Sequence, residues 1–267
     1  MFNPFAQVVL QILPEPEASL LNGILFGIRQ SLPPDLHQAM ITTGTIHIIA
    51  LSGQNISILT RLFSEISLPL GRKKSIITTI LGIIAFVIFV GPDAPVVRAA
   101  IMGSLTLLSV YFGRQSWSLL SLLLAAGIML IVNPQWLGEP SFQLSFMATL
   151  GIILLVSSPV TQGKTSFMQL IRNDFMANLK ITLAAQLFTL PVIIFHFGRI
   201  SLISPLTNVL IGWTITPIMV LGIFASLCGL VLYEAGLVVG WGVWILLSYI
   251  IIVVKWTALI PFAAIGF

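Results

Sequence analysis

Charged residues are scarce in this sequence. Asp, Glu, Lys and Arg make up 7% of its 267 residues, whereas a soluble domain carries about 25%. The mean hydropathy is +1.08, and 57% of the residues are hydrophobic. Most of the surface must therefore face lipid, which excludes a soluble fold. The apolar runs are long and show no alternation of period two, so the sequence indicates an integral helical membrane protein and not a membrane barrel.

Cysteine and histidine are also rare, and this limits the chemistry. Cys228 is the single cysteine, so an intrachain disulfide and a cysteine metal site are excluded. The three histidines form no HExxH pattern, and neither GxxxxGK(S/T) nor G-x-S-x-G occurs. Glu15 and Glu17 form the one close acidic pair, and because Pro16 separates them we expect a solvated turn rather than a catalytic pair. We expect no metal, no cofactor and no enzymatic activity.

Apolar segments alternate with short breaks from residue 45 onward. We predict an all-α, polytopic helical membrane domain over residues 45–267, with about eight transmembrane spans that include broken helices. Residues 1–44 are less apolar and should form an N-terminal segment with an interfacial amphipathic helix. About ten apolar residues are too few to cross a bilayer, so this helix should lie in the interface or pack on the bundle. The spans are expected near residues 46–68, 75–91, 94–112, 117–133, 141–160, 175–197, 203–232 and 235–254.

Basic residues orient the predicted spans. The net charge is +4, and the cations gather at residues 72–74, Arg114, Lys164 and Arg172, after the first, third and fifth spans. These loops lie on one side if the first span runs from outside to inside, and Asp93 then lies on the other side. The N-terminus lacks a basic region and a small-residue cleavage site, so we do not expect a signal peptide. We expect a multi-pass protein of the plasma (inner) membrane.

Polar side chains within the spans are the best indication of function. Each costs on the order of a kcal/mol or more if it faces lipid, so we expect them to face other helices or a wet path. His47, Leu51 and Asn55 share one helical face at spacing i, i+4, i+8, and Ser52-Gly53 predicts a local break. A single such residue also serves as interhelical glue, but the set on several spans favours a shared polar path. The candidate lining residues are His47, Ser52, Gly53, Asn55, Arg98, Gln143, Ser145, Lys180, Gln186, His196 and Asn208.

Arg98 is the most unusual of these residues. It lies one turn inside its span, in the segment GPDAPVVRAAIMGSL. One alternative is that its side chain reaches out to the headgroups. The other is an interior positive charge near the outer mouth, where an anion would enter, with Asp93 within reach as a partner.

Five segments, in order along the chain, resemble the ComEC-type competence family. They read LPEPEASLLNGILFG, TGTIHIIALSGQNISIL, GPDAPVVRAAIMGSL, NPQWLGEPSFQLSFMATLGII and AAQLFTLPVIIFHFGRISLISPLTNVL. The resemblance implies the membrane domain of a DNA-uptake channel that passes single-stranded DNA into the cytoplasm during natural transformation. The candidate lining residues would then form the DNA path. Asn55 replaces the second histidine of the family stretch, so a role that needs that imidazole is not carried over.

The resemblance also implies partners. These are single-stranded DNA, the lipid bilayer, and separate nuclease, DNA-receptor and helicase components, and the small chain favours a homo-oligomer. Fuller family members add an OB-like domain and a metallo-β-lactamase-like nuclease domain. We find no segment of either kind here, so nuclease activity is not carried over.

Two alternatives remain open from the residues alone. A small-solute transporter would use the same polar seam. An intramembrane serine hydrolase would use Ser52 as nucleophile and His196 as base, because residues 50–53 read ALSG and resemble the G-x-S-G motif of rhomboid proteases. Ala50 stands where that motif has glycine.

Overall fold

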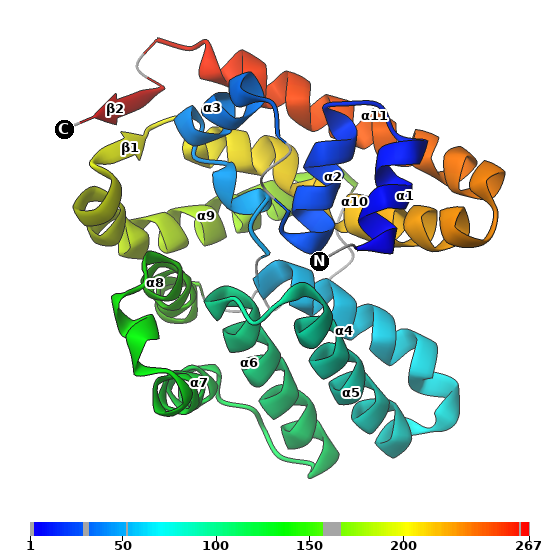
Figure 1. Ribbon diagram of the computed structural model, residues 1–267. Coiled ribbons are helices and arrows are strands. Elements are labelled where there is room, and N and C mark those ends of the chain that lie inside the picture. The colour runs from blue at the N-terminus through cyan, green and yellow to red at the C-terminus, as the bar shows by residue number, and fades with distance from the viewer. Residues whose placement is uncertain (1–2, 29–31, 52, 157–166, 262, 267) are drawn as a thin grey trace. The chain divides into compact units, whose positions relative to one another are not determined.

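The computed structural model describes residues 3–28, 32–51, 53–156, 167–261 and 263–266 (Figure 1). For residues 167–175 it describes the backbone only. The described part is almost entirely helical. The chain forms two compact units, and the first contains Met1–Leu51 and Arg199–Phe267. The second contains Ser52–Gly198. This division differs from the one predicted at residue 44, which stays a prediction.

Unit 1 combines both ends of the chain. Its helices α10 (Ser204–Val231) and α11 (Tyr233–Ala258) are joined through Leu232 and pack along each other (Figure 1). Helices α1 (Pro4–Ile12) and α2 (Glu17–Phe26) pack against this pair, and α3 (Pro34–Thr42) contacts α11. Asn3 caps α1 by accepting the N–H groups of its first turn. Short strands β1 (Arg199–Ser201) and β2 (Ala264–Gly266) pair antiparallel, and η1 (Ile46–Ile48) follows α3.

Helix α2 is covered by protein on nearly every side. All residues from Glu17 to Leu25 are buried, so the helix packs on the bundle, which was one of the two expected positions. The interpretation of the acidic pair as a solvated turn is wrong for Glu17, which is 9% exposed and accepts a 2.7 Å hydrogen bond from Ser248 Oγ of α11. Glu15 is exposed and accepts hydrogen bonds from the backbone N–H and the hydroxyl of Ser19.

Unit 2 is a run of helices in chain order. These are α4 (Gly53–Ser67), η2 (Leu68–Leu70), α5 (Arg72–Val90), α6 (Ala94–Tyr111), α7 (Ser118–Val132), η3 (Pro134–Gly138), α8 (Pro140–Leu155) and α9 (Phe167–Phe197). Helix α4 packs on α5 and α6, and α8 packs on α9. Ala94, Met129 and Phe142 form a buried core that joins α6, α7 and α8.

Five helices in the described part are long and apolar enough to cross a membrane. They are α5, α6, α10, α11 and the portion Met176–Phe197 of α9, and each coincides with one of the predicted spans. Helices α7 and α8 are apolar but have 15 and 16 residues. The total of eight spans therefore stays a prediction.

The predicted first span is not one continuous helix. Gly44 has a φ of 68°, and the hydroxyls of Thr43 and Thr45 lie 2.9 Å apart in a hydrogen bond that belongs to the turn after α3. His47 lies in η1, and α4 begins at Gly53. The shared helical face expected for His47, Leu51 and Asn55 is therefore wrong, because an apolar run alone does not reveal the turn. A helix that begins at Gly53 agrees with the predicted break.

Large apolar side chains cover the outside of the described part. Phe195, Ile131 and Ile88 are 85%, 83% and 78% exposed. Such surface is unfavourable in water and suits contact with lipid acyl chains. Together with the five span-length helices, it identifies a membrane protein.

Candidate functional site

Arg98 is the centre of the candidate site in unit 2. Its side chain is 7% exposed, and its Nη1 donates a 2.9 Å hydrogen bond to the backbone carbonyl of Ser145 on α8. Its Cζ lies 6.0 Å from the centroid of the Phe146 ring, which is within the range of a cation–π contact. The guanidinium is therefore enclosed by helices and does not extend outward to the headgroups.

Gly53, the first residue of α4, lies against the guanidinium. A Cβ atom placed on Gly53 would lie 2.8 Å from Nη2 of Arg98 and 3.5 Å from Cβ of Ala99. A side chain of any size would displace Arg98 or push α4 away from α6. The glycine is needed for this close approach, a role that the predicted break at Ser52-Gly53 did not include.

No acidic side chain within the described residues neutralises Arg98. The one ion pair found among them joins Arg61 to Glu65 on the exposed surface of α4. Asp93, the expected partner, is exposed and forms no ion pair with Arg98. Nε of Arg98 is buried and has no hydrogen-bond partner within the described part. Arginine stays protonated, so Arg98 is a buried cation with no acidic partner among the described residues, an arrangement that costs several kcal/mol.

Gln143 and His196 form a second contact in unit 2. The Nε2 of His196 lies 3.0 Å from Oε1 of Gln143, and Nε2 of Gln143 donates a 2.9 Å hydrogen bond to the carbonyl of Leu137. The hydrogen bond to Leu137 fixes which end of the amide faces His196. That end is the oxygen, which can only accept, so Nε2 of His196 is the donor in this contact. This contact ties the end of α9 to the first turn of α8, close in sequence to Ser145.

The remaining candidates of unit 2 lie on the same helices. Asn55 is buried in the first turn of α4. Lys180 is exposed on α9, and Gln186 is half-buried further along that helix. Ser52 lies outside the described residues, so the proposed Ser52–His196 dyad is not tested.

His47 and Asn208 belong to unit 1. The Nδ1 atom of His47 lies 3.0 Å from the carbonyl of Gly44, and Nδ2 of Asn208 donates to Ser204 Oγ at 3.1 Å. A Cβ on Gly44 would lie 2.8 Å from Ser204, so the segments TGTIH and SPLTN touch each other. The predicted lining residues thus form two groups, one in each unit.

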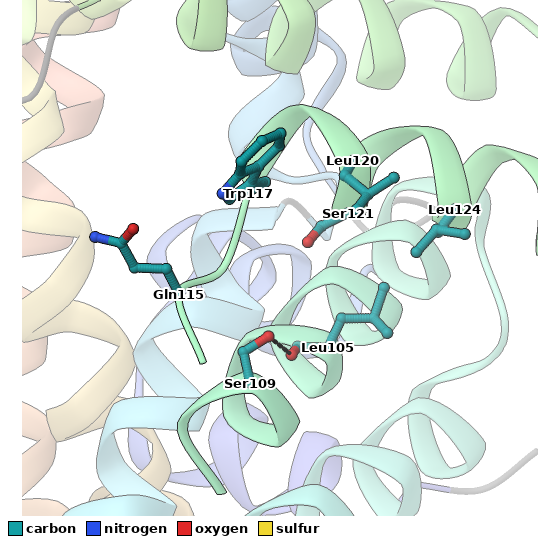
Figure 2. A pocket seen from close by; sticks show the side chains of 7 residues that line it. All are labelled: Leu105, Ser109, Gln115, Trp117, Leu120, Ser121 and Leu124. Atoms are coloured by element: carbon teal, nitrogen blue, oxygen red, sulfur yellow. Dashed lines mark hydrogen bonds between the residues drawn. The ribbon is translucent and has the colours of Figure 1, made fainter. Parts of the chain in front are cut away.

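A cavity of about 350 Å³ lies between α6 and α7 (Figure 2). Most of its lining is apolar, and the hydroxyl of Ser109 is already bonded to the carbonyl of Leu105 within α6. None of the predicted site residues contributes to it, so the cavity is not part of the candidate site. Its lining residues are Leu105, Ser109, Gln115, Trp117, Leu120, Ser121 and Leu124.

Comparison with known protein families gives a match over most of the chain. The family model described as Competence protein matches residues 24–267. The chain belongs to this competence family. It is 31% identical over 201 residues to ComE operon protein 3 of Bacillus subtilis (strain 168), which covers 74% of this chain and 25% of that protein. A protein of Aquifex aeolicus (strain VF5), described as uncharacterized, is 30% identical over 205 residues, or 76% of this chain and 44% of its own length.

The chain therefore spans less than half of the length of either relative. No solved structure gives a significant match. Family membership confirms the resemblance, since the matched range contains four of the five segments and the end of the first. It supports a competence-related role for this membrane protein.

The sequence predicted the site residues of unit 2 that surround Arg98, Gln143 and His196, but it did not predict how they make contact. Ser145 was selected for its side chain, whereas its backbone carbonyl is the group that binds Arg98. Gln143 and His196 were selected separately and prove to be partners. No sequence pattern reveals such a pair, because 53 residues separate its members.

Proposed function

We propose that this chain forms a conduit through which single-stranded DNA crosses the plasma (inner) membrane into the cytoplasm during natural transformation. The chain would be multi-pass and not itself an enzyme. Membership of the competence family and the five span-length helices support this proposal. The observation that carries it is the buried guanidinium of Arg98, which has no acidic partner among the described residues.

The physical reason is the charge of the nucleic acid. Each phosphodiester is an anion, and moving it into a medium of low dielectric constant requires cations or hydrogen-bond donors along the path. Arg98 supplies a fixed positive charge inside a helical unit, at the meeting point of α4, α6 and α8. The amides and hydroxyls of the other lining candidates would add donors that do not depend on base sequence.

The proposed function requires partners. A conduit alone neither captures DNA nor degrades the opposite strand nor pulls the imported strand. The proposal therefore includes separate DNA-receptor, nuclease and helicase components. A homo-oligomer would line a wider pore than one chain.

The test is transformation in a naturally competent host that lacks its own copy of the gene and receives it on a plasmid. Arg98→Ala should insert into the membrane at the normal level yet bring transformation close to the level of the deletion strain. Arg61→Ala is the matched control, because Arg61 is an exposed arginine on a neighbouring helix, and it should transform normally. Normal transformation by Arg98→Ala would contradict the proposal.

Purified protein in proteoliposomes separates the alternatives. We expect a labelled single-stranded oligonucleotide to become protected from external nuclease. Uptake of a labelled metabolite that is insensitive to added single-stranded DNA would instead identify a solute transporter. Labelling of Ser52 by a fluorophosphonate in active protein would overturn the non-enzymatic part of the proposal.

A further inference from the structure

The cavity between α6 and α7 is an apolar groove that is open on one side (Figure 2). Leu120 and Leu124 line it from α7 and are 52% and 46% exposed, whereas Leu105 of α6 is half-buried. Trp117 at its entrance and Leu124 are two turns apart on α7, about 10 Å along the helix axis. Empty apolar space loses dispersion contacts, so a groove of about 350 Å³ that opens into hydrocarbon is filled by the molecules present there.

Polar groups lie at one end of this groove. Gln115 and Trp117 are exposed in the connection between α6 and α7. Ser121, one turn further along α7, is 8% exposed, and its hydroxyl points into the groove (Figure 2). That hydroxyl has no hydrogen-bond partner among the described residues, whereas the hydroxyl of Ser109 donates to a carbonyl of α6. Buried polar groups are nearly always bonded, so the occupant should supply an acceptor at the depth of Ser121.

Cations gather at the same end. Arg114 is exposed, and Nζ of Lys73 lies 5.8 Å from the ring centroid of Tyr111, the last residue of α6. The basic residues 72–74 are therefore close to the end of α6. From the start of α5 to the end of α7 the single acidic residue is Asp93, in the turn at the opposite end. The entrance of the groove is thus complementary to an anion.

The backbone holds Arg114 beside the groove. Gly113 ends α6 with a φ of 67°, and the N–H of Arg114 donates a 2.8 Å hydrogen bond to the carbonyl of Ser109. This is the turn that glycine commonly forms after a helix. Because Ser109 lines the groove, the turn fixes the start of the arginine side chain next to the entrance.

We propose that the groove between α6 and α7 binds one anionic phospholipid from the leaflet that meets the basic end of these helices. One acyl chain lies along the leucines, an ester carbonyl accepts from Ser121, and the phosphate lies at the entrance beside Arg114. The order of apolar, donor and cationic groups along the groove matches the order of chain, ester and phosphate in the lipid. Tryptophan at the entrance is typical of the membrane interface. This site depends on the membrane location of the chain and not on passage of DNA.

Other occupants match fewer of these features. A free phosphate would leave the leucines uncovered, and a neutral lipid would not use the cations. The carbonyls of a helix from a second copy are already bonded within that helix, so such a helix would not supply the acceptor that Ser121 needs. Basic pockets at the cytoplasmic side of membrane helices are a common place for anionic headgroups.

The test is native mass spectrometry of the full purified chain in an uncharged glycoside detergent, with dioleoyl phosphatidylglycerol added stepwise. Each chain should retain one phosphatidylglycerol, with an affinity at least about tenfold higher than for phosphatidylcholine with the same chains, because several cations act on the headgroup. Arg114→Gln should weaken binding of phosphatidylglycerol about fivefold. Arg199→Gln removes an exposed arginine of unit 1 and should change nothing. Equal affinity of the unaltered chain for the two lipids would overturn the inference.

A substitution that fills the groove tests where the lipid lies. Leu124→Trp should weaken binding of both lipids at least about tenfold, since excluding about two methylenes suffices for such a loss. Leu123→Trp is the matched control, because Leu123 is exposed on the same helix and does not line the groove. Gel filtration and thermal unfolding check that each variant folds. Unchanged affinity in folded Leu124→Trp would overturn the site.

Ser121→Ala removes a single atom and so remains informative if Leu124→Trp does not fold. It should weaken binding of phosphatidylglycerol about threefold, as the loss of one hydrogen bond does. A diether phosphatidylglycerol lacks the ester carbonyl, and its affinity should be the same for Ser121→Ala and for the unaltered chain. An equal loss with both lipids would overturn this placement of the lipid.

Two further outcomes would identify a different occupant. Glycerol phosphate, which has a phosphate and no acyl chain, should not compete with phosphatidylglycerol at equal concentration. Full competition would identify a simple phosphate site and overturn the inference. Lipid-free dimers that Leu124→Trp dissociates and Leu123→Trp does not would identify a second copy of the chain in the groove, and would overturn it as well.

Discussion

At the scale of single residues, contacts at glycine set the distance between helices. Gly151 of α8 faces α9, and a Cβ there would meet the backbone carbonyl of Ala184 and lie 2.9 Å from the ring of Phe188. A carbonyl in a helix cannot move aside without moving the helix. Gly151 therefore permits the close packing of α8 on α9.

Gly151→Ala should lower the free energy of unfolding by about 1–3 kcal/mol, as overpacking does in other cores. The measurement is denaturation of the purified protein in mixed micelles, followed by circular dichroism. Gly127→Ala in α7 is the matched control, because it has open space and should raise stability by about 0.5–1 kcal/mol through helix propensity. Equal effects of the two substitutions would contradict this account of α8–α9 packing.

Ser248 is a second single-residue contact with a measurable role. Its hydroxyl donates to the buried carboxylate of Glu17 at 2.7 Å, and hydrogen bonds to charged groups are stronger than neutral ones. Ser248→Ala should lower the free energy of unfolding by about 1.5–3 kcal/mol.

Ser226→Ala provides the comparison for Ser248→Ala in the same denaturation experiment. Ser226 is buried in α10, but its hydroxyl donates only to the carbonyl of Ile223 in its own helix. We expect a smaller change there. If Ser226→Ala lowered the free energy of unfolding as much as Ser248→Ala does, the hydrogen bond to the Glu17 carboxylate would contribute no more than a hydrogen bond within a helix.

At the scale of elements, the ends of α8 and α9 are held together by one side-chain pair. Gln143 is in the first turn of α8, and His196 is at the end of α9, beyond Pro191. Proline lacks the N–H that would support the preceding turn, so the last residues of α9 depend more on contacts with α8.

A double-mutant cycle of Gln143→Ala and His196→Ala should give a coupling free energy of about 0.5–1.5 kcal/mol, as for one neutral hydrogen bond. The measurement is the unfolding free energy of the two single variants and the double variant. The pair Thr149→Ala and His196→Ala should show additivity, because Thr149 bonds within its own helix. Additivity in the first pair would rule out the contact as a tie between the helices.

How far the sequence predicts these elements depends on the range of the interaction involved. The five span-length helices and the start of α4 at Gly53 follow from local apolarity and local backbone preference. The burial of Glu17 does not, because its donor is 231 residues away. In the candidate site, the residue types were predictable from the cost of polar groups in lipid, but the carbonyl of Ser145 was not, since every residue has one.

At the scale of the whole molecule, charge distribution gives an orientation that can be tested within unit 2. Lys73 at the start of α5 lies 5.8 Å from the ring centroid of Tyr111 at the end of α6. The basic residues 72–74 and Arg114 therefore lie at one end of this helix pair. Asp93 lies at the other end, in the turn from α5 to α6.

On a Cys228→Ser background, a cysteine at position 114 should react with a membrane-impermeant maleimide only after permeabilisation. A cysteine at position 93 should react in intact cells, since basic ends stay in the cytoplasm. Labelling is read as a mass shift on a gel. Reaction of both positions from the same side would rule out α5 and α6 as an antiparallel pair of spans.

Unit 1 is assembled from segments that are far apart in the chain, and this fixes an order during synthesis. Glu17 leaves the ribosome 231 residues before Ser248, which is roughly 10–50 s of elongation at about 5–20 residues per second. For most of that interval, while all of unit 2 is made, α2 lacks α10 and α11, against which it is later buried. The carboxylate of Glu17 therefore stays without its Ser248 donor until α11 is made, so the buried state of α2 is one of the last features of unit 1 to form.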